Sequence, residues 1–112
     1  YNYESELKKR LNEAPTKIKK ISAPIRVYID NETSDDHTII EVNCKNTPGV
    51  LFQITKCISH LNLQIYNASI STYGTRITDL FYVKDLFGQK IIDQRKINNI
   101  KNQIYEILNE SS

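Results

Sequence analysis

The order of the periodic segments along this chain predicts an α+β fold in which one four-stranded antiparallel sheet carries two helices on one face. Three observations support this prediction. Two segments with strand-like alternation precede an apolar helical stripe, two more strand-like segments follow it, and a second helical stripe comes last. With 112 residues, the chain is long enough for one domain with a hydrophobic core.

The composition is that of an ordinary globular domain and argues against several functional classes. Hydrophobic residues make up 39% of the chain and charged residues 25%. The net charge of +2 is too small to indicate a nucleic acid or an anionic membrane as partner. No apolar run approaches the roughly 18–20 residues that span a bilayer, and we find no signal peptide. Because the chain begins at Tyr1 and lacks methionine, we expect it to be part of a longer protein.

The first two strands are predicted to form a hairpin. The segment Ile25–Ile29 alternates with period two, the polar stretch Asn31–Asp36 has the composition of a turn, and Thr38–Cys44 alternates again. A helix is then predicted over Gly49–Leu61, with an apolar stripe formed by Val50, Leu51, Ile54, Cys57, Ile58 and Leu61.

A second hairpin and a second helix complete the predicted domain. Gln64–Tyr73 is predicted to be a strand that Gly74 ends, with Arg76–Lys84 as its hairpin partner. Because Arg76–Lys84 is apolar on both faces, we expect it in the middle of the sheet. Asp93 is predicted to cap a final helix with an apolar stripe of Ile97, Ile100, Ile104, Ile107 and Leu108.

This order of elements predicts a ferredoxin-like two-layer sandwich. The usual arrangement ends with a strand that pairs beside the first one, but nothing strand-like follows Leu108. We therefore predict that Ile25–Ile29 takes the place of the usual last strand, paired with Thr38–Cys44 at that edge of the sheet.

The corner between the second strand and the first helix is the candidate binding site. We expect Thr47 to cap the helix, Pro48 to occupy its first position, and Gly49 to allow close approach of a ligand. The N–H groups of Gly49, Val50 and Leu51 would then lack partners at the positive end of the helix dipole, which suits a small carboxylate. A capped turn that binds nothing is the alternative.

Cysteine and histidine residues give little support to a metal site or a nucleophile. Cys57 and His60 are three residues apart, but Cys57 belongs to the apolar stripe, and His37 lies in a polar loop. Because we find no four convergent ligands, neither a zinc site nor a Cys–His catalytic pair is favoured. We expect Cys44 and Cys57 to be buried free thiols, which fits a reducing, cytoplasmic compartment.

Several segments together resemble ACT domains, which are small amino-acid-sensing regulatory modules. The nearest likeness is to the C-terminal ACT domain of the bifunctional uridylyltransferase/uridylyl-removing enzymes, which modify the nitrogen-regulatory PII protein. The segments that carry the resemblance are Val27–Glu32, Thr38–Val42, Pro48–Leu51, Leu61–Ile65, Ala68–Gly74 and Asp79–Ile91. The last of these is the most specific, because Pro-Gly before a helix is common.

The resemblance implies how the chain is divided. Residues 24–112 would be one ACT domain, and residues 1–23 the end of a preceding domain with its linker. This would explain the apolar stripe Tyr3, Leu7 and Leu11, which no nearby segment covers. The basic cluster Lys17, Lys19 and Lys20 would then be a solvated connector.

The resemblance also implies a regulatory function. The parent enzymes carry a nucleotidyltransferase domain and a metal-dependent phosphohydrolase domain, require a divalent metal such as Mg²⁺, and respond to glutamine. This chain contains neither set of catalytic motifs, so we expect it to be non-catalytic and to need no cofactor of its own. Its partners would be the amino acid, a second ACT domain or a homodimer mate, and PII through the parent enzyme.

The candidate effector-binding residues are those of the corner and one residue of the following strand. Where the family usually has Asp-Arg-Pro-Gly, this chain has Asn46-Thr47-Pro48-Gly49. Asn46 can still donate and accept hydrogen bonds, and Gln64 matches a position that ACT domains often direct at a ligand across a domain interface. The expected set is Asn46, Thr47, Pro48, Gly49, Val50, Leu51 and Gln64.

The same elements also fit two other functions. A structural ACT module that pairs with another domain and binds no ligand fits the apolar strand equally well, and Tyr66 and Tyr73 could lie in such an interface. An RNA-recognition module shares the topology, but the segment Thr75–Phe81 lacks the required aromatic pattern, and Asp79 would repel phosphate.

Overall fold

The computed structural model describes residues 24–111 of the chain. The stripe Tyr3, Leu7 and Leu11, the basic cluster, and the predicted domain end and linker at 1–23 lie outside the described residues. Six elements follow one another: β1 (Arg26–Asp30), β2 (Thr38–Lys45), α3 (Val50–His60), β3 (Leu63–Tyr73), β4 (Arg76–Asp85) and α4 (Gln94–Ser111).

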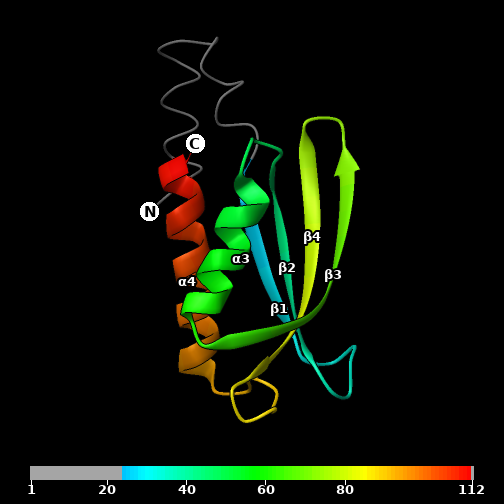
Figure 1. Ribbon diagram of the computed structural model, residues 1–112, viewed down its shortest axis with the longest axis vertical. Coiled ribbons are helices and arrows are strands. Elements are labelled where there is room, and N and C mark those ends of the chain that lie inside the picture. The colour runs from blue at the N-terminus through cyan, green and yellow to red at the C-terminus, as the bar shows by residue number, and fades with distance from the viewer. Residues whose placement is uncertain (1–23, 112) are drawn as a thin grey trace.

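The architecture is the predicted two-layer α+β sandwich of the ferredoxin-like kind. The four strands form one antiparallel sheet in the order β1-β2-β4-β3, and both helices cover the same face (Figure 1). β1 pairs with β2 in antiparallel register and so occupies the edge predicted for it in place of the usual last strand. No helix in residues 24–111 is long and apolar enough to cross a membrane.

The core lies between the sheet and the two helices. Since side chains alternate between the faces of a strand, every second residue of β2 and β4 points toward the helices. Ile40 of β2 faces Phe81 of β4, and both side chains are fully buried. The helices contribute most of the predicted apolar stripes, although Leu51 of the predicted stripe is exposed. The buried helix residues are Val50, Ile54, Cys57, Ile58, Ile100, Ile104 and Leu108.

Helix α4 is anchored at its start and along its length. Asp93 caps it as predicted, because its Oδ1 accepts the N–H of Arg95 at 2.9 Å. The hydroxyl of Tyr105 accepts the backbone N–H of Val27 at 3.1 Å. This bond ties the last helix to the edge strand β1.

Strand β3 is the other edge of the sheet and is largely exposed. It pairs only with β4, and a bulge interrupts the pairing between Ile65 and Asn67. Ten of its eleven residues are exposed. Its outer edge therefore presents backbone N–H and C=O groups that no strand within residues 24–111 pairs.

Candidate functional site

The corner between β2 and α3 is a tight turn, and it differs from the predicted cap. Gly49 has φ 78° and ψ 0°, and the N–H of Val50 donates to the carbonyl of Thr47 at 3.1 Å. These values define a type II turn with Pro48 and Gly49 at its centre. Helix α3 begins only at Val50, so Pro48 is not its first residue, and no side chain, Thr47 included, caps it.

The turn changes which backbone groups remain available. Val50 was predicted to leave its N–H free, but Thr47 accepts it, while Gly49 accepts the N–H of Gln53 at 3.1 Å. Within residues 24–111, the N–H groups of Gly49, Leu51 and Phe52 have no such acceptor. The helix start therefore still presents three N–H donors at the positive end of its dipole.

Two of these residues, Gly49 and Leu51, line a hollow of about 460 Å³ on the helix face of the sheet. The whole predicted corner contributes to its lining, and the two C-terminal strands supply the rest. The N–H of Asn46 donates to the carbonyl of Thr75 at 2.7 Å, which fixes the corner against the β3–β4 hairpin. The lining residues are Asn46, Thr47, Pro48, Gly49, Val50, Leu51, Ile70, Thr72, Ile77 and Asp79.

Four lining residues were not predicted, namely Ile70, Thr72, Ile77 and Asp79, and only Asp79 among them carries an ionisable side chain. Its side chain is 0% exposed, and neither carboxylate oxygen has a hydrogen-bond partner. Burial raises the pKa of Asp79 from its ordinary 3.8 to about 6. A signal was available, because period-two alternation places an acidic residue on the same inward face as Ile77 and Phe81.

Gln64, the remaining predicted site residue, lies apart from the corner. It pairs with Lys84 at the far end of β3, and its Nε2 donates to the carbonyl of Asp85 at 3.0 Å. The structure therefore brings Asn46–Leu51 together but not Gln64. Its predicted role requires that it come from a facing domain.

The two cysteines are buried free thiols, as predicted. Burial, and secondarily the nearby charge of Asp79, raises the pKa of Cys44 to about 11. Burial also raises the pKa of Cys57. Both thiols are therefore neutral and unreactive near pH 7. Residues 24–111 contain no group of three or more side chains that could hold a metal ion.

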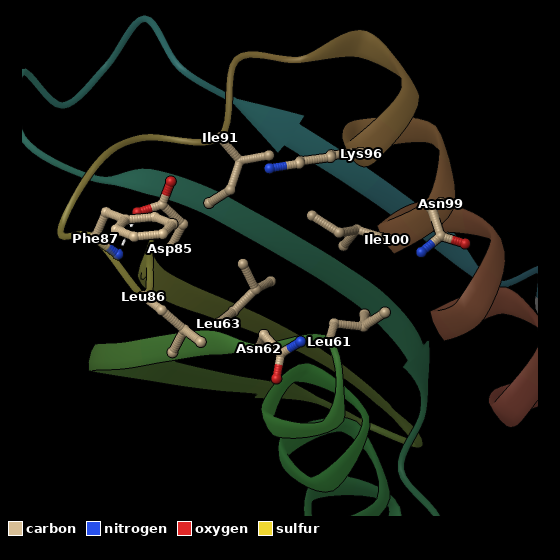
Figure 2. A pocket seen from close by; sticks show the side chains of 10 residues that line it. All are labelled: Leu61, Asn62, Leu63, Asp85, Leu86, Phe87, Ile91, Lys96, Asn99 and Ile100. Carbon is tan, nitrogen blue, oxygen red and sulfur yellow. Dashed lines mark hydrogen bonds between the residues drawn. The ribbon is translucent and has the colours of Figure 1, made fainter.

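A second hollow, of about 290 Å³, lies at the opposite end of the sheet (Figure 2). Leu63, Ile91 and Ile100 point into it, and Asp85 lies beside Phe87 at its border. Asp85 is engaged there, because its Oδ1 accepts the N–H groups of Phe87 and Gln89, both at 2.9 Å. Its lining is mainly apolar, and within residues 24–111 it contains no buried side-chain polar atom without a hydrogen-bond partner.

The fold is a small α+β module of one four-stranded antiparallel sheet with two helices, and the corner lies at the start of the first of these helices. A family model described as "ACR family N-terminal ACT domain" matches residues 33–111. The chain therefore belongs to the ACT-domain family. No solved structure was found to match it.

Curated relatives place the chain near two groups of ACT proteins. It is 40% identical over 107 residues, 96% of this chain, to the bifunctional uridylyltransferase/uridylyl-removing enzyme of Azospirillum brasilense, and covers 12% of that protein. For the Gluconobacter oxydans enzyme of the same name, identity is 46% over 85 residues, 76% of this chain and 9% of the enzyme. The Arabidopsis thaliana ACT domain-containing protein ACR2 is 41% identical over 81 residues, 72% of this chain and 16% of that protein.

The relatives confirm the predicted resemblance and show how much of their length this chain covers. The chain spans only about a tenth of the length of the bacterial enzymes, since it covers 12% and 9% of them. The matching family model is named for an N-terminal ACT domain. Which ACT position this chain occupies in its own protein therefore stays a prediction.

Proposed function

We propose that this chain is the amino-acid-sensing ACT domain of a bifunctional uridylyltransferase/uridylyl-removing enzyme, with glutamine as its effector. The observation that carries the proposal is the corner hollow, where the N–H donors of Gly49 and Leu51 lie at the start of α3. The α-carboxylate of an amino acid would bind these donors. Asn46, at the rim, would hydrogen-bond the rest of the ligand.

Tight sensing requires a second domain. A carboxylate at a helix start gains only about 0.3–2 kcal/mol from the dipole. The unpaired edge of β3 is where a facing ACT domain would dock, because an exposed strand edge is a template for pairing. A two-fold axis near the middle of β3 would bring the Gln64 end of one copy beside the Thr72 end of the other. The role of Gln64 in trans stays a prediction.

We infer the cellular compartment and the parent protein from the relatives and the buried thiols. We infer a cytoplasmic enzyme, because Cys44 and Cys57 are unpaired although buried. The parent protein would act on PII and would hold its divalent metal in domains outside this chain. Coupling between effector and catalysis would be on the order of 1–3 kcal/mol, as in other allosteric proteins.

Calorimetric titration with glutamine tests the proposal, both on this chain and on a longer chain with two ACT domains. Leu51→Glu is the test variant, because an acidic residue in the first turn stabilises the helix yet repels a bound carboxylate. Thr55→Glu is the matched control, since Thr55 lies one turn further on and does not line the hollow. We expect Leu51→Glu to abolish the heat of binding and Thr55→Glu to preserve it. No heat from the unmodified two-domain chain would overturn the proposal.

A ligand-free structural ACT module is the alternative, and the exposed edge strand favours it. Ile65, Tyr66 and Ile70 of β3 are 38%, 52% and 49% exposed, and Phe52 of α3 is 68% exposed. A purely structural module would use this surface for pairing and would dimerise without responding to any amino acid. Sedimentation of the chain with and without glutamine separates the two functions.

A further inference from the structure

Asp79 is a buried charge for which the chain provides no compensation. Within residues 24–111 it is the only carboxylate whose two oxygens are both buried and unbonded. Burying a carboxylate without a partner is unfavourable, and native proteins rarely keep such a group. Its presence on a core face therefore requires an explanation.

The residues next to Asp79 do not explain why its charge is buried. Its register partners are Val42 on β2 and Ile70 on β3, and both side chains are apolar. Arg76, the cation on the same strand, donates to Asn43 from Nε and to the carbonyl of Pro24 from Nη2, and its Nη1 is buried without a partner. No described cation forms an ion pair with Asp79, and burial is the cause of its raised pKa.

The hollow thus has two polar sides, one that favours an anion and one that favours a cation. The N–H groups at the start of α3 suit an anion, whereas Asp79 is the only acidic side chain among the lining residues and suits a cation. An α-amino acid carries a carboxylate and an ammonium group on neighbouring carbon atoms. One zwitterion therefore carries both of the charges that the two sides of the hollow favour.

We propose that Asp79 accepts the ammonium group of the effector while the N–H groups of Gly49 and Leu51 bind its carboxylate. This inference rests on the proposed sensing function and assigns the ammonium contact to a residue of this same chain. Since bulk water does not reach Asp79, side chains that line the hollow must shift to admit the ligand, and its exposed large apolar ones are Leu51 and Ile70, 37% and 49% exposed.

The charge state of Asp79 makes the proposal sensitive to pH. The other titratable groups on the buried faces around it are the thiols of Cys44 on β2 and Cys57 on α3, and β3 contributes only Ile70 and Thr72 to the hollow. Both thiols stay neutral below about pH 8, because burial raises their pKa values. Acidification therefore protonates Asp79 alone in this part of the core and weakens its attraction for an ammonium group.

The test compares two ligands on two variants by calorimetry, using the form of the chain that binds glutamine. The ligands are L-glutamine and glutaramate, which is glutamine without its amino group. The variants are Asp79→Asn and, as a control with the same charge change, Asp36→Asn in the exposed loop after β1. We expect Asp79→Asn to weaken glutamine binding on the order of 100-fold, to leave glutaramate binding within about threefold, and Asp36→Asn to change neither.

Each outcome has a distinct meaning. If the unmodified protein binds no amino acid, the sensing function falls, and this inference falls with it. If it binds glutamine and Asp79→Asn binds equally well, only the role of Asp79 is overturned. Should Asp79→Asn fail to fold, the unmodified protein decides the matter. Its preference for glutamine over glutaramate must fall as the pH is lowered through about 6, and a constant preference would refute the inference.

Discussion

Two aspartates of strand β4 differ in the burial and in the hydrogen bonding of their carboxylates. Asp85, at the end of β4, accepts the N–H groups of Phe87 and Gln89 through one oxygen, and its carbonyl accepts the N–H of Gly88 at 3.0 Å. Asp79, in the middle of β4, is buried with both oxygens unbonded. Because residue type and strand are the same, the difference separates an aspartate that holds a loop together from one that the fold only tolerates.

The two hollows repeat this difference. The hollow beside Asp85 has a mainly apolar lining and an acidic residue engaged with its own loop (Figure 2). The corner hollow combines free N–H donors with an unpartnered carboxylate. Cavities whose polar groups are satisfied from within need no ligand, whereas unsatisfied buried polar groups mark a candidate binding site.

The strongest test of this comparison is the stability of Asp79→Asn in the absence of ligand. We expect its free energy of unfolding near pH 7.5 to rise on the order of 1–3 kcal/mol, because a neutral amide is easier to bury than an unpaired carboxylate. Urea denaturation measures the change, and Asp36→Asn should stay within about 0.5 kcal/mol of the unmodified chain. A gain in stability combined with lost binding is the behaviour expected of a functional residue. Destabilisation by Asp79→Asn would instead show that the carboxylate supports the fold.

The pH dependence of stability shows whether the charge of Asp79 destabilises the folded chain. The folded-state pKa of Asp79 is about 6, above its ordinary value of 3.8. The protonated side chain is therefore favoured in the folded state, so its contribution is fully present below about pH 3.8 and is lost as the pH rises through about 6. The stability advantage of Asp79→Asn over the unmodified chain should accordingly grow between these values and level off above them. A flat difference would mean that Asp79 titrates normally.

Asp85→Ala should change stability in the opposite direction. Removing its carboxylate leaves the N–H groups of Phe87 and Gln89 without their acceptor, and we expect a loss of about 1–2 kcal/mol. The same denaturation experiment measures it, and amide hydrogen exchange should quicken in the loop after β4 rather than at the corner. If Asp85→Ala stabilised the chain as Asp79→Asn is expected to do, the contrast between the two aspartates would be lost.

The sequence predicted the fold more completely than the site, for identifiable physical reasons. The helices and strands followed from periodicity, and the edge position of β1 followed from the lack of a strand-like segment after Leu108. The cap at the corner was wrong because Pro48-Gly49 fits either a helix start or a type II turn, and only the positive φ of Gly49 decides between them. Asp79 escaped notice because a charge inside an apolar strand becomes informative only when its lack of partners is seen.

The corner itself can be tested with two glycines that share a backbone conformation. Gly49 has φ 78° and Gly74 has φ 60°, and a Cβ added at either position would meet nothing within 4 Å. We therefore expect Gly49→Ala and Gly74→Ala each to lose about 1 kcal/mol of stability through backbone strain alone, as thermal denaturation would show. Only Gly49→Ala should also weaken glutamine binding in calorimetry, because it displaces the turn that orients the N–H donors of α3. If both variants weakened binding equally, the loss would reflect stability, and if neither did, the turn would have no part in recognition.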